Sequence, residues 1–145
     1  MEFIQASKSY YLDRSTYINL RWIAIIGQFI TINSVKFLLE FEFPYLLSNI
    51  IILFGILSNL YLYHFDINPQ ISNKSSFIYL LIDIFQLSIL LYLTGGVLNP
   101  FSIFLIIPSI FSSSNLNIRT NLTLITITLF IIIFLTFFSH DLPYP

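Results

Sequence analysis

The sequence predicts an all-α fold, a polytopic membrane helical bundle of about five transmembrane helices. Hydrophobic residues make up 57% of the 145 residues and charged residues only 9%, and the mean hydropathy is +0.86. A soluble domain of this length could not bury so much apolar surface. The lipid bilayer is therefore the expected partner, and several long apolar runs mark where the chain crosses it.

Four apolar runs are long enough to be membrane spans. A bilayer core about 30 Å thick requires roughly 20 helical residues, and the runs at 20–39, 45–65, 77–93 and 122–138 approach that length. Short polar turns separate them, so no linker divides the chain. We expect residues 1–19 to form an N-terminal cytoplasmic segment, without a cleavable signal peptide, and residues 20–145 to form one transmembrane domain.

The fourth run, at 100–116, is shorter and either crosses the bilayer thinly or re-enters it. As an α-helix it covers about 24 Å, and Pro108 should kink it. The positive-inside rule favours a crossing. With five spans and a cytoplasmic N-terminus, most basic residues share the inner side and the acidic loop residues lie outside: Lys8, Arg14, Arg21, Lys74 and Arg119 against Glu40, Glu42 and Asp141.

The composition also excludes several classes of function. The net charge of −1 indicates no nucleic-acid surface, and the absence of cysteine excludes disulfides, thiolate metal sites and thiol switches. We find no metal-site pattern, no catalytic constellation and no glycine-rich nucleotide loop. His64 and His140 flank apolar runs, and we interpret both as interfacial residues.

Asp83 lies about six residues into the third run, where a charged side chain has a high free-energy cost. A charge inside a span costs about 2.5 to 3.5 kcal/mol on insertion scales and normally finds a partner within the bundle. Gln28 of the first run lies near the same depth, so we predict that Asp83 contacts Gln28, with Arg21 reaching the same carboxylate. This contact either holds two helices together or acts as a proton or signal relay. Lys36 is expected to snorkel and pair with Glu40.

The segment 94–101 joins the third and fourth runs at the outer surface. Gly95 and Gly96 permit positive φ angles, and Asn99 before Pro100 indicates an N-cap and a first helical residue. The free amides at that helix start suit a carbonyl oxygen, with Tyr92 and Phe101 as an apolar wall. A plain reversal between two helices is the alternative interpretation.

At these residues the sequence resembles the membrane region of the RegB/PrrB-type redox-responsive sensor histidine kinases of bacterial two-component systems. Gly95, Gly96, Asn99, Pro100 and Phe101 match that family's Gly-Gly-x-x-Asn-Pro-Phe element at every fixed position. The start of the first run is also similar, through Leu20-Arg21-Trp22-Ile23-Ala24 followed by Gly27-Gln28. The likeness covers most of the chain.

The resemblance implies a multi-pass sensor of respiratory redox state in the bacterial inner membrane. It implies ubiquinone contact at Gly95, Gly96, Asn99, Pro100 and Phe101. We expect supporting or relay roles for Arg21, Trp22, Gln28, Asp83 and Tyr92. A homodimer is expected, and a response regulator would be a partner only through a kinase core. That core, the sixth span, the phosphorylated histidine and the redox-active cysteine of the family are not found in these residues.

Two other functions stay open at this point. One is a small membrane transporter or channel subunit, with Asp83 as its ion-handling residue. The other is a truncated, non-functional fragment whose helices only insert.

Overall fold

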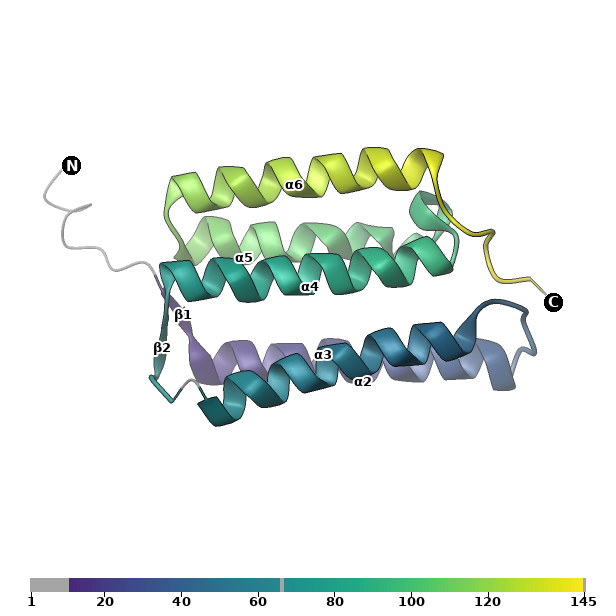
Figure 1. Cartoon of the computed structure of the whole chain (residues 1–145), viewed down its shortest axis with the longest axis horizontal. Helices are drawn as coiled ribbons and strands as arrows, with labels where there is room; N and C mark the ends of the chain where they lie inside the picture. The colour runs from purple at the N-terminus through teal and green to yellow at the C-terminus, as the bar shows by residue number, and fades with distance from the viewer. Residues whose placement is uncertain (1–10, 66, 145) are drawn as a thin grey trace, which may run out of the picture.

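A computed structural model describes residues 11–65 and 67–144, and it consists of helical segments packed side by side with alternating direction (Figure 1). Four helices of the described residues are long and apolar enough to cross a membrane, which confirms a polytopic helical bundle: α2 (Arg14–Phe37), α3 (Tyr45–Phe65), α4 (Asn73–Leu93) and α6 (Ile118–Phe137). Between α4 and α6 lie the short 3₁₀ helix η1 (Gly96–Leu98), the longer η2 (Pro100–Ile106) and α5 (Ile107–Asn115).

Three of the long helices begin before their apolar runs, because polar residues cap them. The Asp13 side chain accepts hydrogen bonds from the Thr16 amide at 3.2 Å and the Thr16 hydroxyl at 2.5 Å, so α2 begins at Arg14. Ser72 caps α4 and Asn117 caps α6 in the same way. Hydrophobicity marks only the part of a helix that faces lipid or core, whereas the cap fixes its start. Residues 1–10 of the predicted N-terminal segment, including Lys8, lie outside the described residues.

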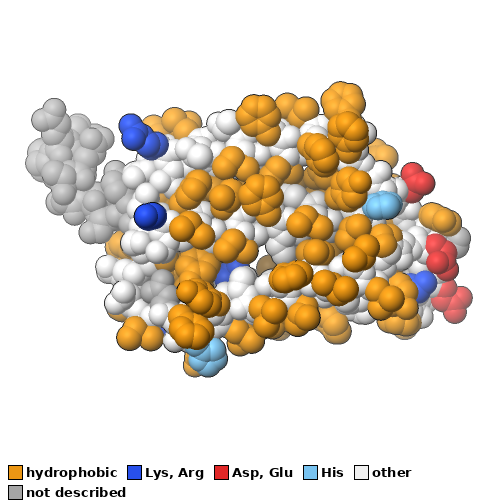
Figure 2. Space-filling model, in the orientation of Figure 1, with side chains coloured by type: hydrophobic (Ala, Val, Ile, Leu, Met, Phe, Trp, Pro, Cys, Tyr) orange, Lys and Arg blue, Asp and Glu red, His pale blue; other side chains and the backbone are white. Residues whose placement is uncertain are grey.

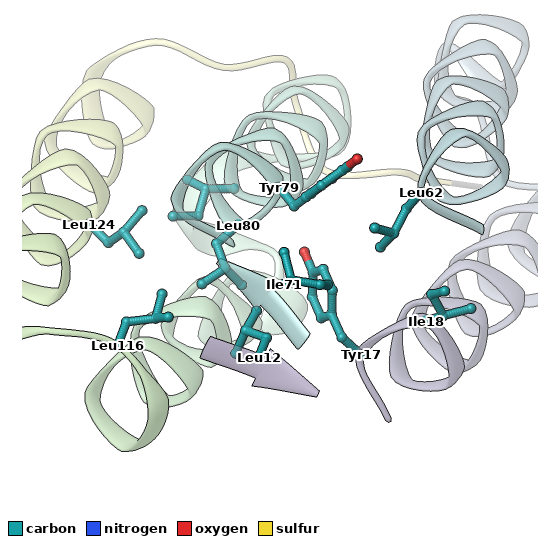
Figure 3. Packing of buried hydrophobic residues seen from close by; sticks show 10 residues of the cluster. Leu12, Tyr17, Ile18, Leu62, Ile71, Tyr79, Leu80, Leu116 and Leu124 are labelled. Carbon is teal, nitrogen blue, oxygen red and sulfur yellow. The ribbon is translucent and has the colours of Figure 1, made fainter. Parts of the chain in front are cut away.

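A small antiparallel sheet, which the sequence analysis missed, ties the starts of α2 and α4 together. Strand β1 (Tyr11–Asp13) pairs with β2 (Gln70–Ser72), with Leu12 opposite Ile71. Both of these side chains are buried, and they point into the cluster formed by Tyr17, Leu80 and Leu116 (Figure 3). The sheet therefore anchors one end of the bundle through its own core.

The fourth run crosses the whole length of the bundle. Figure 1 shows it returning from the end where α4 finishes to the end where α4 begins. Its first seven residues are 3₁₀ and its last nine are α. At about 2.0 Å and 1.5 Å of rise per residue these add to about 27 Å, against about 30 Å for α6. Pro108 lies in the first turn of α5, where an amide has no intrahelical partner to lose.

The surface of the bundle is apolar along its length and charged at its ends. In Figure 2 hydrophobic side chains cover the visible face, with basic groups toward the end that carries the strands and acidic groups at the other end. Lys36 lies at the acidic end, and its Nζ is 3.6 Å from Glu42 Oε2, which corrects the predicted pairing with Glu40. Glu40 has a φ of 58° and reverses the chain, so the helical spacing behind that prediction does not apply.

Candidate functional site

The Asp83 carboxylate forms the centre of a buried polar cluster between α2 and α4. Arg21 donates to Oδ1 through Nε at 3.0 Å and through Nη2 at 2.8 Å, and the Tyr17 hydroxyl donates to Oδ2. The Arg21 side chain is 5% exposed and that of Asp83 is 26% exposed. The predicted contact with Arg21 is therefore present, and both carboxylate oxygens are engaged.

The Arg21 guanidinium also joins α3 to this cluster. Its Nη2 donates to Ser58 Oγ at 2.6 Å, and Ser58 in turn donates to the Gly55 carbonyl at 2.9 Å. The guanidinium carbon lies 5.3 Å from the ring centre of Tyr17 and 5.7 Å from that of Tyr79, distances typical of cation–π attraction. Its Nη1 has no hydrogen-bond partner among the described residues. One cation thus connects three helices and keeps one donor unused.

Gln28 does not contact Asp83, which corrects that prediction. It pairs instead with Gln86, through amide hydrogen bonds of 2.8 Å and 3.3 Å in opposite directions. Helices α2 and α4 run in the same direction, and Gln28 lies two turns, about 10 Å, beyond Arg21. The Asp83 carboxylate is therefore bonded by residues two and three turns before Gln28, namely Arg21 and Tyr17, and the Gln28 amide bonds to the Gln86 amide. Trp22 is half-buried and packs against the cluster that contains Tyr17, Leu80 and Leu116.

Sequence reasoning missed two members of the cluster, Tyr17 and Ser58. Tyr17 had a detectable signal, because it precedes Arg21 by four residues and so shares its helix face. Ser58 had none, because nothing in the sequence tells how α3 is rotated against α2.

At the C-terminal end of α4, the glycine bend has the predicted backbone conformation but not the predicted free amides. Gly95 and Gly96 have φ angles of 109° and 60°. Asn99 caps η2 by accepting from the Phe101 amide at 2.9 Å, and its Nδ2 donates to the Thr94 carbonyl at 3.1 Å and hydroxyl at 2.9 Å. The Asn99 side chain is therefore occupied within the bend at both its oxygen and its nitrogen.

The segment after α6 covers the two glycines. A Cβ added to Gly95 would lie 2.7 Å from Leu142 Cγ, and one added to Gly96 would lie 2.8 Å from Ser139 Cβ and 2.9 Å from the Leu135 carbonyl. The glycines thus allow two segments of the chain to pack closely. The sequence analysis had predicted free amides at this place, able to bind a carbonyl oxygen. Two aromatic side chains near the bend remain accessible, because Phe101 is 45% exposed and Tyr92 is 37% exposed.

Comparison with known proteins identifies relatives of this bundle. The family model of PilS-like transmembrane domains matches residues 15–144. The sensor histidine kinase RegB of Cereibacter sphaeroides is 32% identical over 128 residues, which are 88% of this chain and 28% of that protein. The chain thus spans less than a third of the length of this relative. No solved structure matches.

Proposed function

The chain belongs to the family of PilS-like transmembrane domains, and we propose that it is the membrane sensor portion of a two-component sensor histidine kinase that responds to respiratory redox state by binding a quinone. The similarity to RegB covers most of the chain and agrees with the resemblance found in the sequence. We place the domain in the bacterial inner membrane, as a homodimer that reaches a response regulator only through a kinase core.

The charge at the two ends of the bundle supports a cytoplasmic N-terminus. Arg14, Lys74 and Arg119 lie near the starts of α2, α4 and α6, which Figure 1 places at the same end. Glu40 and Glu42 lie between α2 and α3, and Asp141 follows α6, all at the opposite end of the bundle. Because basic residues accumulate on the cytoplasmic side of short loops, the end with the strands faces the cytoplasm and the glycine bend faces outward.

The observation that carries the quinone proposal is the position of the Gly95–Phe101 bend, which joins α4 to η2 and packs against the segment after α6. In that segment the His140 amide donates to the Tyr92 carbonyl at 2.8 Å, and the ring centres of Tyr92 and His140 are 5.3 Å apart. A quinone ring held against Tyr92 would therefore contact both α4 and the segment after α6, and Phe101 at the start of η2 is 45% exposed. A quinone that binds there more tightly in one redox state shifts their packing by that difference in affinity.

The test uses the full chain in lipid nanodiscs with a photoreactive ubiquinone. We expect the oxidised probe to label the bend more strongly than the reduced probe, and Phe101→Ala to remove most of that labelling. Phe54→Ala, which changes a 61% exposed phenylalanine on α3, is the matched control and should label like the parent chain. Equal labelling of the bend in the Phe101 and Phe54 variants would contradict the proposal.

The geometry around Asp83 favours the sensor over a transporter or channel subunit. An ion-handling carboxylate needs an oxygen that can release its partner and accept an ion. Both oxygens of Asp83 are held here, by Arg21 and by Tyr17. Proton flux into liposomes that Asp83→Asn abolishes would reverse this preference.

A further inference from the structure

The start of α6 carries a hollow on a side of the bundle that faces lipid. Figure 1 shows α6 along one edge of the bundle, and its main contacts are with α4, α5 and η1. The hollow has a volume of about 500 Å³ and is lined by Ile118, Arg119, Leu122, Thr123, Thr126 and Ile127. These residues form two ridges with a spacing of four, so the hollow runs along the helix for about 14 Å.

Arg119 lines the hollow at the cytoplasmic end of α6. The helix has 20 residues and is about 30 Å long, so its first turn lies at the edge of the apolar layer. The Arg119 side chain is exposed, and its guanidinium has no ion pair or hydrogen bond within residues 11–65 and 67–144. A positive charge therefore lies unpaired at the level where lipid headgroups begin.

The rest of the hollow is apolar in character, because both threonines donate their hydroxyl hydrogens within the helix. Thr123 donates to the Arg119 carbonyl and Thr126 to the Leu122 carbonyl, each at 2.8 Å. Ile118 and Leu122 are 74% and 55% exposed, and a hydrocarbon chain can cover them without breaking a hydrogen bond. The hollow thus has a cationic end and an apolar remainder, which together match an amphipathic anion.

We propose that this hollow binds one anionic phospholipid, with its phosphate at the Arg119 guanidinium and an acyl chain along Leu122 and Thr126. A guanidinium can hold two phosphate oxygens through parallel N–H donors. Anionic headgroups of the cytoplasmic leaflet attract basic residues close to the membrane surface. The site does not depend on quinone binding, because the glycine bend packs against Leu135 and Ser139 at the other end of α6.

A second copy of the chain fits this hollow less well than a lipid does. Copies inserted in the same direction bring their cytoplasmic ends together, so an anionic partner for Arg119 would have to lie at that end. Among the described acidic residues only Asp13 lies there, and its carboxylate accepts from Thr16 as the cap of α2. The segment after α6 leads away from the hollow, because it crosses the outer end of the bundle and Tyr144 pairs with Glu42.

The experiment uses the full chain in phosphatidylcholine nanodiscs with two photoreactive lipids, a phosphatidylglycerol and a phosphatidylcholine, each with a diazirine at the same acyl carbon. Labelled peptides are mapped by mass spectrometry. We expect the anionic probe to label residues 118–127 about fivefold more than the neutral probe, the factor for one basic residue near the membrane surface. Arg119→Gln should remove this preference. Lys74→Gln, which removes another exposed charge at the same end, is the matched control and should retain it.

Thr126→Trp tests the apolar part of the hollow, because it fills the space along the helix and keeps Arg119. It should lower labelling of residues 118–127 by the anionic probe to the level of the neutral probe. Thr136→Trp is the matched control, because Thr136 is also exposed and donates to a backbone carbonyl, that of Ile132, at 2.8 Å, but does not line the hollow. Circular dichroism verifies that the variants are folded.

Each pattern of labelling gives a decision. A preference for the anionic probe that Arg119→Gln and Thr126→Trp remove, and that both controls retain, supports the site. Equal labelling of the parent chain by the two probes overturns it, because ordinary contact with the bilayer would explain that result. A preference that survives Arg119→Gln, or that Lys74→Gln also removes, overturns it as well. If a second copy covers the hollow, neither probe labels it and Thr123→Cys in this cysteine-free chain oxidises to a disulfide-linked dimer, which also overturns the proposal.

Discussion

The middle of α4 and its C-terminal end accommodate polar groups in different ways. Around Asp83 the polar groups are side chains from three helices, which bond to one another across the helix interfaces. At the glycine bend the polar groups are mostly backbone, they bond within the bend, and the segment after α6 covers them. The first arrangement holds separate helices together through side chains, whereas the second joins consecutive segments through the backbone.

Removing one charge from the Asp83 cluster should have the largest effect on either region. Asp83→Ala leaves the 5% exposed Arg21 without its counter-ion, and breaking a buried pair costs about 3 to 5 kcal/mol. We expect a corresponding loss in unfolding titrations in mixed micelles. The double variant Arg21→Leu/Asp83→Leu should regain most of that loss, while Asp141→Ala, at an exposed position after α6, should change nothing. If the double variant is no more stable than Asp83→Ala, the loss of stability does not come from leaving Arg21 without its counter-ion.

Adding a methyl group at the bend should give the second-largest loss of stability. Gly96→Ala places a Cβ 2.9 Å from the Leu135 carbonyl at a φ of 60°, and the left-handed backbone alone costs about 1 to 3 kcal/mol. Gly27→Ala is the control of opposite sign, because nothing lies within 4 Å of its Cβ position and alanine favours the helix by about 0.5 to 1 kcal/mol. The thermal midpoints of the two variants should move in opposite directions.

The sealing of the bend can be measured independently of stability. The chain has no cysteine, so Thr94→Cys, at a residue of the bend that is 4% exposed, gives a single thiol. We expect maleimide to label this thiol slowly in the parent background and faster when combined with Gly96→Ala, because the clash displaces the covering segment. Fast labelling before that change would show that the bend is open.

The Gln28–Gln86 pair, between the two regions, should contribute less. Each single change to leucine leaves one buried amide without its partner, and hydrogen bonds between membrane helices are worth about 0.6 to 1.7 kcal/mol. A double-mutant cycle with Gln28→Leu and Gln86→Leu should give a coupling free energy in that range. A coupling near zero would show that water or other groups replace the lost amide.

The cap at Asp13 should give the smallest effect and a pH dependence. Hydrogen bonds from the Thr16 side chain and then the Thr16 amide lower the pKa of Asp13 below its usual value of 3.8. A carboxyl whose folded pKa is lowered stabilises the fold above its unfolded pKa and loses this contribution as the pH falls through the folded value. Asp13→Ala should lower the thermal midpoint slightly at pH 7, with the difference vanishing in acid. Asp13→Asn keeps a cap and should show no such pH dependence.

The sequence predicted the spans and the costly residues better than it predicted their partners. Hydrophobic run lengths located α3 at 45–65, and the cost of a buried charge identified Asp83 as bonded. Choosing Gln28 as its partner required relative helix depth and rotation, which periodicity does not give. The strands were missed because three residues carry too weak a pattern, although Leu12 and Ile71 are nearly fully buried.

The bend illustrates the same limit for a site. Glycine, asparagine and proline at 95–100 predicted the positive φ angles and the cap, because those features are local. Whether the glycines face a ligand or another backbone depends on residues 139–142, about forty positions later. Local chemistry thus indicated where the chain reverses, and tertiary packing decided what fills the space.

The seven 3₁₀ residues of η2 give the fourth crossing a further property. A residue that changes from 3₁₀ to α geometry shortens its segment by about 0.5 Å and rotates the rest of the helix by about 20°. By the same geometry, conversion of all of η2 would retract α5 by about 3.5 Å and rotate it by about 140°. In the crossing that starts at the glycine bend, a small shift along the helix axis is therefore coupled to a large rotation of α5.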